Sequence, residues 1–203
     1  MLNKNFKVKS LYIFAIIFLF VNVVYGQKTW KQMSIQEKTS ASKRVADQTY
    51  SEIEFLIPLD RRAFIKRFGW LAVYDYNEYG VLASVKLAQG GLECGFGNIL
   101  DRGLKVNNYF SIKCREKKHK EHRCLVLDDG GEIAHFVSYK NAFDSFRGHT
   151  NHIQKYYSSL INQQNYKRWT SVLSKKYAVD KEYERKLNFL IKKYELTKYD
   201  VKI

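Results

Sequence analysis

Apolar residues recur with helical spacing before and after a single glycine, and this pattern constrains the fold more than any other feature. Phe64, Phe68 and Leu71 lie three or four residues apart, which predicts the buried face of a helix that begins near Asp60, its expected N-cap. Gly80 ends that helix, because glycine readily adopts the left-handed conformation found after a helix C-terminus. The sequence therefore predicts two successive helices joined at Gly80.

The second helix ends in the segment LAQGGLECGFGN, which places one carboxylate among four glycines. Val81, Val85, Ala88 and Leu92 form its single buried stripe, and Glu93 follows at the edge of that stripe. The two glycines inside the helix each cost roughly 1 kcal/mol relative to alanine. This cost predicts that another backbone or a ligand approaches the helix closely here.

The middle of the chain changes from helical to strand-forming sequence. The runs CLVL and IAHFVSY are separated by the turn-forming segment DDGGE, so we predict a hairpin from about Arg123 to Tyr139. Three further helices are marked by Phe143, Phe146, Ile153, Tyr157 and Leu160, by Tyr166, Trp169 and Leu173, and by Tyr183, Leu187, Leu190, Ile191 and Tyr194. The expected fold class is α+β and mostly helical, with a small β-hairpin lobe and no internal repeat.

The first 26 residues have the composition of a secretory signal peptide. Three lysines precede an apolar run from Leu11 to Val21, and Gly26 provides a small residue at the expected cleavage site. An uncleaved membrane anchor is the alternative, but the run is shorter than the roughly 20 residues that a spanning helix needs. We predict export and cleavage, with no stable membrane span afterwards and a periplasmic, secreted or wall-associated protein. Residues 27–58 would follow as a polar, loosely attached N-terminal arm.

The charge of the chain favours anionic partners. Cleavage would remove three lysines and no acids, lowering the formal net charge from +15 to +12 in a chain long enough for one domain with a substantial core. Nucleic acid, acidic lipid and an anionic wall polymer all suit this charge. Export makes nucleic acid the least accessible, and no nucleic-acid-binding motif is present, so no such partner is expected. A basic surface without a specific ligand is the alternative, and we expect a monomer.

Three cysteines suggest one disulfide and one remaining thiol in an oxidising compartment. Cys114 and Cys124 are the natural pair because they close a short loop, which leaves Cys94 as a structural thiol rather than a nucleophile. The same loop contains His119 and His122, so a zinc site is the alternative. Its spacing matches no standard zinc module, and GFGNILDRG lacks the strand and spacing of a dinucleotide-binding motif. No metal and no cofactor are expected.

Glu93 is the first candidate for chemistry. Its neighbours Leu92 and Phe96 would partly desolvate the carboxyl group and raise its pKa. A carboxylic acid that keeps its proton near neutral pH can donate that proton to a leaving oxygen. The alternative is a helix-terminal glutamate that points into water, but the surrounding glycines and aromatic residues favour a site.

Asp128, Asp129 and Glu132 form a second acidic group at the predicted hairpin turn. Glycoside hydrolysis commonly uses two carboxyl groups several ångströms apart, and a hairpin tip folded over a helix end could supply the second. By composition alone an ordinary turn explains these residues better, since aspartate and glycine are common in turns. The chain also has 15 tyrosines, whose rings could stack on sugar faces, although core packing accounts for most of them.

Four ordered segments resemble the glucosaminidase domains of glycoside hydrolase family 73, which hydrolyse peptidoglycan. YGVLASVKLAQGGLECGFGN is similar to the family's catalytic helix with its LAQ and LESGWG elements, and VNNYFSIKC is similar to its NN-F-GIK segment. FVSYKNAFDSFRGHTNHI resembles the F-x-x-Y stretch, and the segment from Tyr166 to Asp200 resembles the closing Y-x-x-W, YATD and YxxKL elements. The resemblance implies a lysozyme-like fold, with residues 59–203 as the glucosaminidase catalytic domain.

The resemblance also implies an activity and its catalytic residues. The expected enzyme is an endo-β-N-acetylglucosaminidase that cleaves the β-1,4 bond after N-acetylglucosamine in peptidoglycan glycan strands. Glu93 corresponds to the proton donor, and Tyr177 to a tyrosine near the reactive sugar. The second carboxylate lies on the β lobe, where Asp129 is preferred to Asp128, or the substrate's acetamido group takes its part. A non-catalytic module of the same fold that binds glycan or cell wall is the alternative.

The substrate-binding residues and the departures from the family pattern complete the expectations. The residues expected to bind substrate are Asn108, Phe110, Phe96 and Tyr139. The departures are Cys94 for serine, Phe96 for tryptophan, Ser111 for glycine, Val137 for arginine and Val179 for threonine. Phe96 keeps an aromatic face but loses an N–H donor. These changes could tune the substrate or weaken activity, but none of them removes Glu93.

Overall fold

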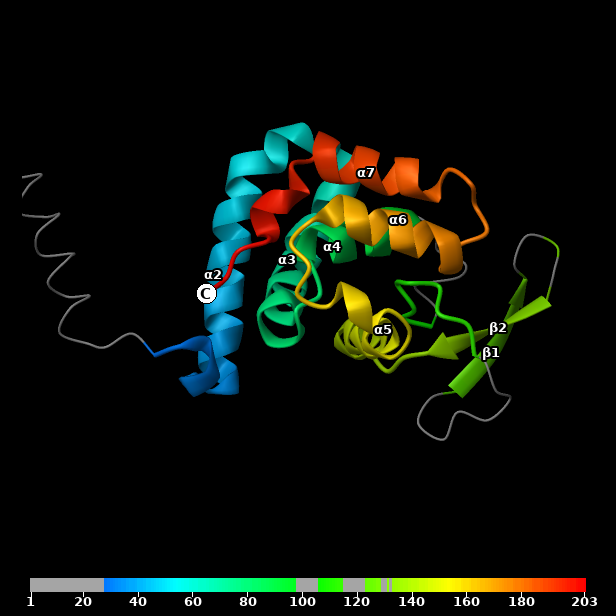
Figure 1. Ribbon diagram of the computed structural model, residues 1–203, viewed down its shortest axis with the longest axis horizontal. Coiled ribbons are helices and arrows are strands. Elements are labelled where there is room, and N and C mark those ends of the chain that lie inside the picture. Colours follow the sequence, from blue (N-terminus) through cyan, green and yellow to red (C-terminus); the bar gives the residue numbers. More distant parts are fainter. Residues whose placement is uncertain (1–27, 98–105, 115–122, 129–130, 132) are drawn as a thin grey trace, which may run out of the picture.

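The computed structural model describes residues 28–97, 106–114, 123–128, 131 and 133–203 (Figure 1). The helices are α2 (Ile35–Ile53), α3 (Leu59–Tyr79), α4 (Ala83–Glu93), α5 (Ala142–Tyr156), α6 (Tyr166–Lys176) and α7 (Tyr183–Lys193). Short turns are η1 (Trp30–Gln32), η2 (Glu54–Leu56), η3 (Gly95–Gly97), η4 (Ser158–Leu160) and η5 (Leu196–Tyr199). The strands β1 (Arg123–Asp128) and β2 (Ile133–Ser138) pair in an antiparallel hairpin. The predicted class, α+β and mostly helical with a small hairpin lobe, is confirmed.

The predicted signal peptide, residues 1–26, lies outside the described residues. Among the residues that are described, no helix combines the length and the apolar character needed to cross a bilayer.

Residues 35–53 form α2, so the prediction of a loosely attached arm is wrong for this segment. Ser34 caps the helix: its hydroxyl oxygen accepts from the amide of Glu37, and the Glu37 carboxylate accepts from the amide of Ser34. α2 packs along α3 at one side of the molecule (Figure 1). Several of its buried residues are small, such as Ala41 and Ala46. Small residues allow close packing but leave only a weak apolar repeat in the sequence.

α3 and α4 follow one another as predicted, with Gly80 between them. Gly80 has a φ of 71°, and its amide donates to the carbonyl of Tyr76 at 3.0 Å. A Cβ atom at this position would also overlap the side chain of Asn162, so both the conformation and the space require glycine. Asp60 lies in the first turn of α3, whereas Pro58 occupies the N-cap position that Asp60 was expected to hold.

α4 lies at the centre of the helical lobe and contacts α3, α6 and α7 (Figure 1). The predicted single stripe is too narrow, because every residue from Ala83 to Gly91 is buried. The polar members have internal partners. The Lys86 ammonium bonds to the carboxylate of Asp75, to the hydroxyl of Thr150 at 2.5 Å and to the carbonyl of Phe146 at 3.0 Å. Surrounded on all sides, α4 holds its C-terminal residue in a fixed place.

The two glycines near the end of α4 make room for aromatic rings. A Cβ atom on Gly91 would overlap the ring of Phe96, and one on Gly90 would lie 3.2 Å from the rings of Phe64 and Phe110. The close approach at these glycines is thus made by aromatic side chains rather than by another backbone, and Gly91 also lines a cavity beside Glu93. The cost of the glycines in helix stability is offset by dense aromatic packing around the helix end.

The hairpin has the predicted position, and Leu125 lies opposite Phe136 in its register. Lys113 forms an isolated bridge with Phe136, which joins residues 106–114 to β2. The predicted disulfide between Cys114 and Cys124 is present, with the two Cα atoms 6.2 Å apart. It joins the same segment to β1.

α6 and α7 cover the predicted helical segments, but α5 is shorter than predicted. It ends at Tyr156, since Tyr157 leaves the helical conformation with φ −137° and ψ 33°. The short turn η4 then carries Leu160 back into the core, where both Tyr157 and Leu160 are buried. The apolar repeat across this break is tertiary packing rather than one continuous helix.

Candidate active site

Glu93 is the last residue of α4 and lines a cavity of about 550 Å³. The cavity lies between the C-terminus of α4, the segment 111–113, strand β2 and the connection from α6 to α7. Its other walls include Leu92, Ser111, Lys113, Phe136, Tyr177 and Asp180. Glu93 is half-buried here, which differs from the alternative of a glutamate that points into bulk water.

Two neighbouring cavities extend the cleft around Glu93. One has a volume of about 240 Å³ and shares Leu92 and Lys186 with it. The other has a volume of about 360 Å³ and shares Ser111, Lys113 and Tyr177. The Glu93 cavity therefore adjoins a further cavity through each of two different sets of residues, and we refer to the three adjoining cavities together as the groove.

The Glu93 carboxyl is oriented by the first residue of α7. Its Oε1 accepts a hydrogen bond from the Tyr183 hydroxyl at 2.7 Å. The Tyr183 side chain is buried, and its ring stacks on that of Tyr177 with centroids 6.1 Å apart and planes 15° apart. Burial, and then the negative charge of Glu93, raise the pKa of Tyr183 well above its usual value. The hydroxyl thus keeps its proton and acts as a donor to Glu93.

Tyr177 lies in the groove as its predicted role requires, although its hydroxyl is already engaged. The hydroxyl donates to the carbonyl of Phe110 at 2.7 Å. Burial raises the pKa of Tyr177 well above its usual value, followed by the effect of the nearby Glu93 charge. Tyr177 therefore contributes to the cavity wall with its hydroxyl already bonded to the backbone.

The predicted substrate-binding residues are mostly part of the core. Asn108 is 2% exposed, and its amide donates to the carbonyls of Ile112 and Val137, both at 2.9 Å. Phe110 is fully buried. The expectation that their side chains line the groove is wrong, because both turn inward: Asn108 bonds to Val137 of β2, and the Phe110 ring packs against Phe146 and His149 of α5.

The other two predicted binding residues are also buried. Tyr139 packs its ring over Gly148, and burial raises its pKa to about 12. Phe96 is 8% exposed, has a positive φ of 55° and lies under the guanidinium of Arg61, 5.0 Å from its ring centroid. Phe96 lines the smaller neighbouring cavity with part of its surface. The structure thus assigns Tyr139 to the core and Phe96 to the base of the groove.

The hairpin carboxylates are the part of the predicted site that the structure describes least. Asp129 and Glu132 lie outside the described residues, and Asp128 ends β1. Among the described residues that line the Glu93 cavity, the second carboxylate belongs to Asp180. It bonds to the Lys186 ammonium at 2.7 Å, which lowers its pKa.

Several residues that shape the site were absent from the sequence prediction. Tyr183 was expected only as part of an apolar stripe, and Gln89 only as part of a resemblance. Lys113 and Lys186 line the cavity and add positive charge. Cys94, predicted as a structural thiol, is buried, and burial raises its pKa to about 11. A thiol held in that form is a poor nucleophile.

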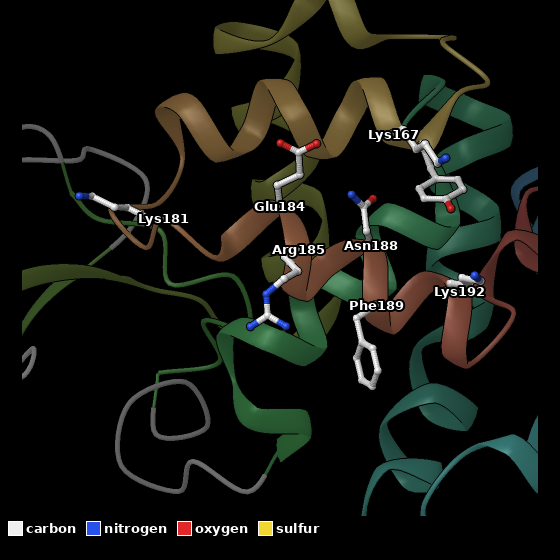
Figure 2. A pocket seen from close by; sticks show the side chains of 8 residues that line it. Lys167, Lys181, Glu184, Arg185, Asn188, Phe189 and Lys192 are labelled. Carbon is white, nitrogen blue, oxygen red and sulfur yellow. The ribbon is translucent and has the colours of Figure 1, made fainter.

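A larger hollow of about 770 Å³ lies elsewhere, between α6 and α7 (Figure 2). It has four cationic side chains, from Lys167, Lys181, Arg185 and Lys192. Figure 2 shows these side chains pointing in different directions, with Glu184 turned toward α6. Since the charged groups do not converge on one point, this hollow lacks the geometry of a catalytic centre.

The chain resembles known proteins over most of its length. A family model described as "Glucosaminidase: Mannosyl-glycoprotein endo-beta-N-acetylglucosaminidase" matches residues 70–196. Exo-glucosaminidase LytG of Bacillus subtilis is 30% identical over 155 residues, which make up 70% of this chain and 54% of LytG. An N-acetylmuramoyl-L-alanine amidase domain-containing protein of Staphylococcus aureus is 29% identical over 154 residues, which make up 70% of this chain and 25% of that protein. The chain thus spans about half of the first relative and a quarter of the second.

Solved structures share the fold. The catalytic domain of the autolysin Auto from Listeria monocytogenes aligns with a TM-score of 0.56 and 24% identity, covering 75% of this chain and 96% of that domain. The glycoside hydrolase domain of FlgJ from Salmonella typhimurium aligns with a TM-score of 0.55 and 21% identity, covering 68% of this chain and 89% of that domain. These likenesses confirm the predicted lysozyme-like fold. The family model also matches more than half of the residues of this chain. The chain therefore belongs to the glucosaminidase family, glycoside hydrolase family 73.

Proposed function

We propose that this protein is a peptidoglycan hydrolase that cleaves the β-1,4 bond after N-acetylglucosamine, with Glu93 as general acid. The observation that carries the proposal is a half-buried carboxyl group in a cavity that adjoins two others, held by the Tyr183 hydroxyl at 2.7 Å. The names of LytG, an exo-glucosaminidase, and of the FlgJ glycoside hydrolase domain support glycan hydrolysis. Cavities that adjoin the Glu93 cleft through two different sets of residues favour internal, endo-type cleavage of a strand.

The proposed first step is proton transfer from Glu93 to the departing glycosidic oxygen. As the proton leaves, negative charge develops on the carboxyl group. The hydrogen bond from Tyr183 stabilises that charged form, so the same contact that orients Glu93 also assists the transfer. The Tyr177 ring, which lines the cavity, would contact the sugar by apolar packing, because its hydroxyl is already bonded to Phe110.

The electron-deficient anomeric carbon then needs a partner on the opposite face of the sugar. We propose Asp129 of the hairpin for this role, with Asp128 as the neighbouring choice, or the substrate's own acetamido group. Asp180 is less suited, since its carboxylate is engaged by Lys186 and by the amide of Glu182 at 2.8 Å.

Replacing Glu93 with glutamine tests the proposal most simply. Glutamine keeps the shape of the side chain but has no proton of suitable acidity, so we expect loss of lysis in a gel that contains purified cell wall. Glu184→Gln is the matched control, because Glu184 lies on α7 and outside the Glu93 cavity. Lysis retained by Glu93→Gln would overturn the assignment. Wall binding without lysis by the wild type would support the alternative, a glycan-binding module.

The hairpin assignment has its own test. We expect Asp129→Asn to reduce lysis more than Glu132→Gln does, because only the first removes the proposed second carboxylate. The reverse order would show that the hairpin has been aligned incorrectly with the family pattern.

The proposed substrate agrees with the proposed location. Export through the signal peptide at residues 1–26, followed by cleavage, would bring the chain to the cell wall, and residues 59–203 would form the catalytic unit, with α2 packed against it. The net positive charge would hold the enzyme near its anionic wall polymer.

A further inference from the structure

A chain of buried hydrogen bonds leads from Glu93 into the core. The Tyr183 hydroxyl, which donates to Glu93, accepts from Nε2 of Gln89 at 3.2 Å. Oε1 of Gln89 lies 3.2 Å from Nε2 of His149. Gln89 lies one turn before Glu93 on α4, His149 lies on α5, and both are fully buried. Three helices thus contribute to one polar chain that ends at the proposed general acid.

His149, at the far end of this series of hydrogen bonds, determines which group donates in each of them. Nδ1 of His149 is buried and has no hydrogen-bond partner among the described residues. An orphaned buried N–H is rarer than an orphaned acceptor, so Nδ1 carries no proton and Nε2 carries one. Burial, and then the positive charge of Lys86, hold the pKa of His149 well below its usual value, so the ring is neutral. His149 therefore donates from Nε2 to Gln89.

Each later donor follows from the one before it. Because Oε1 of Gln89 accepts from His149, the amide Nε2 of Gln89 points toward Tyr183 and donates to its oxygen. A tyrosine hydroxyl has one proton, which Tyr183 then donates to Oε1 of Glu93. Since Oε1 is the acceptor in this bond, the acid proton of Glu93 is carried by Oε2.

We propose that Gln89 and His149 are positioning residues for the general acid, acting through Tyr183 to assign the proton of Glu93 to a single carboxyl oxygen. This inference rests on the proposed function, because it assumes that Glu93 is the acid. Neither residue touches the cavity that contains Glu93. Through Tyr183 they keep Oε1 of Glu93 as the hydrogen-bond acceptor, so that Oε2 carries the acid proton in each turnover.

The reverse direction of the chain is the competing arrangement. It would require Gln89 to turn its amide nitrogen toward His149 and its oxygen toward Tyr183. His149 would then carry its proton on Nδ1, where no acceptor lies among the described residues. An Nδ1 proton would therefore be buried without a partner, and the Phe110 ring, stacked 4.0 Å away, covers the imidazole face.

Kinetics of three variants test the proposal against a purely structural role. We expect His149→Phe, which keeps an aromatic ring against Phe110, to lower kcat about tenfold with KM changed less than twofold. His149→Gln can place an amide donor near the position of Nε2, so we expect it to restore most of kcat. Tyr183→Phe should lower kcat by at least as much as His149→Phe. Tyr199→Phe is the matched control, because the Tyr199 hydroxyl is buried without a partner among the described residues.

Two results would overturn the proposal. Equal losses in His149→Phe and His149→Gln would mean that the ring acts by packing alone, and an unchanged kcat in His149→Phe would mean that the chain has no role. Either result leaves the proposed function intact if Glu93→Gln is inactive in the same assay. Failure of the wild type to release any product would instead refute the proposed function.

A second measurement does not depend on activity. Nitrogen-15 NMR of the labelled full chain reports which nitrogen of His149 carries the proton. We expect a neutral ring with its proton on Nε2 between pH 6.5 and pH 8. A proton on Nδ1, or a charged ring in this range, would contradict the proposed direction of hydrogen-bond donation from His149 to Glu93.

Discussion

Replacing Asp75 with asparagine would leave the buried ammonium of Lys86 without its counter-charge. Lys86 is fully buried, and its three protons are taken up by Asp75, the Thr150 hydroxyl and the Phe146 carbonyl. Asparagine has nearly the same shape as aspartate, so packing changes little. The substitution therefore isolates the charge of Asp75 from its volume.

The expected loss of stability follows from the burial of this pair. Removing one partner of a buried ion pair typically costs 3–5 kcal/mol, because the remaining charge is uncompensated. Burial already lowers the pKa of Lys86, and without Asp75 this lysine would lose its proton to avoid that cost. For a domain of this size each kcal/mol lowers Tm by roughly 2–4 °C. We therefore expect Asp75→Asn to lower Tm by roughly 6–20 °C.

Circular dichroism during heating at pH 7 measures this shift. The double variant Asp75→Asn, Lys86→Met removes both charges, so we expect it to be more stable than Asp75→Asn alone. The pair joins α3 to α4, and Lys86 also bonds to Phe146 and Thr150 of α5, so activity should fall with folding rather than before it. A Tm within 2 °C of the wild type for Asp75→Asn would refute the reasoning, as would a double variant that is less stable than the single one.

Two further predictions concern the surroundings of α4. Burial raises the pKa of Asp200 to about 6 from 3.8, although it accepts hydrogen bonds from Ser84. The folded protein thus holds a proton that the unfolded chain releases, so raising the pH from 4 to 6 should lower the free energy of unfolding by roughly 2 kcal/mol. Urea unfolding at each pH measures the free energy of unfolding, which should fall with pH by this amount in the wild type and not in Asp200→Asn. The same pH dependence in both proteins would contradict the prediction. Gly91→Ala should destabilise the fold by about 1–2 kcal/mol, because its Cβ overlaps the ring of Phe96. An unchanged urea midpoint would contradict this prediction, because it would mean that the Phe96 ring moves aside without a cost in stability.

The helices that could be predicted are those whose buried residues are large. α6 and α7 present residues such as Trp169 and Leu187 at regular spacing, and each is fully buried. α2 was missed because Ala41, Ser42 and Ala46 make much of its contact, and small residues resemble a polar linker in sequence. The break after α5 was missed because Tyr157 and Leu160 continue the apolar repeat while the backbone leaves the helix.

The candidate site shows a similar division. Glu93 stands out as a candidate because its surroundings are unusual in sequence, and the structure places it in a cavity wall, with aromatic rings packed against the adjacent glycines. Tyr183 and His149 could not be predicted as site residues, since a helical repeat does not reveal which buried tyrosine or histidine meets a carboxyl group. The roles expected for Asn108 and Phe110 failed for the complementary reason. A short motif shows that a segment is present, but only the fold shows which side chains turn inward.

Mass spectrometry of purified peptidoglycan digested by the wild type and by Glu93→Gln tests the central claim most directly. Reduction of the products before analysis marks the sugar at each new reducing end. The account predicts new reducing ends at N-acetylglucosamine with the wild type and none with Glu93→Gln. New ends at the other sugar, or the same products from both proteins, would contradict it.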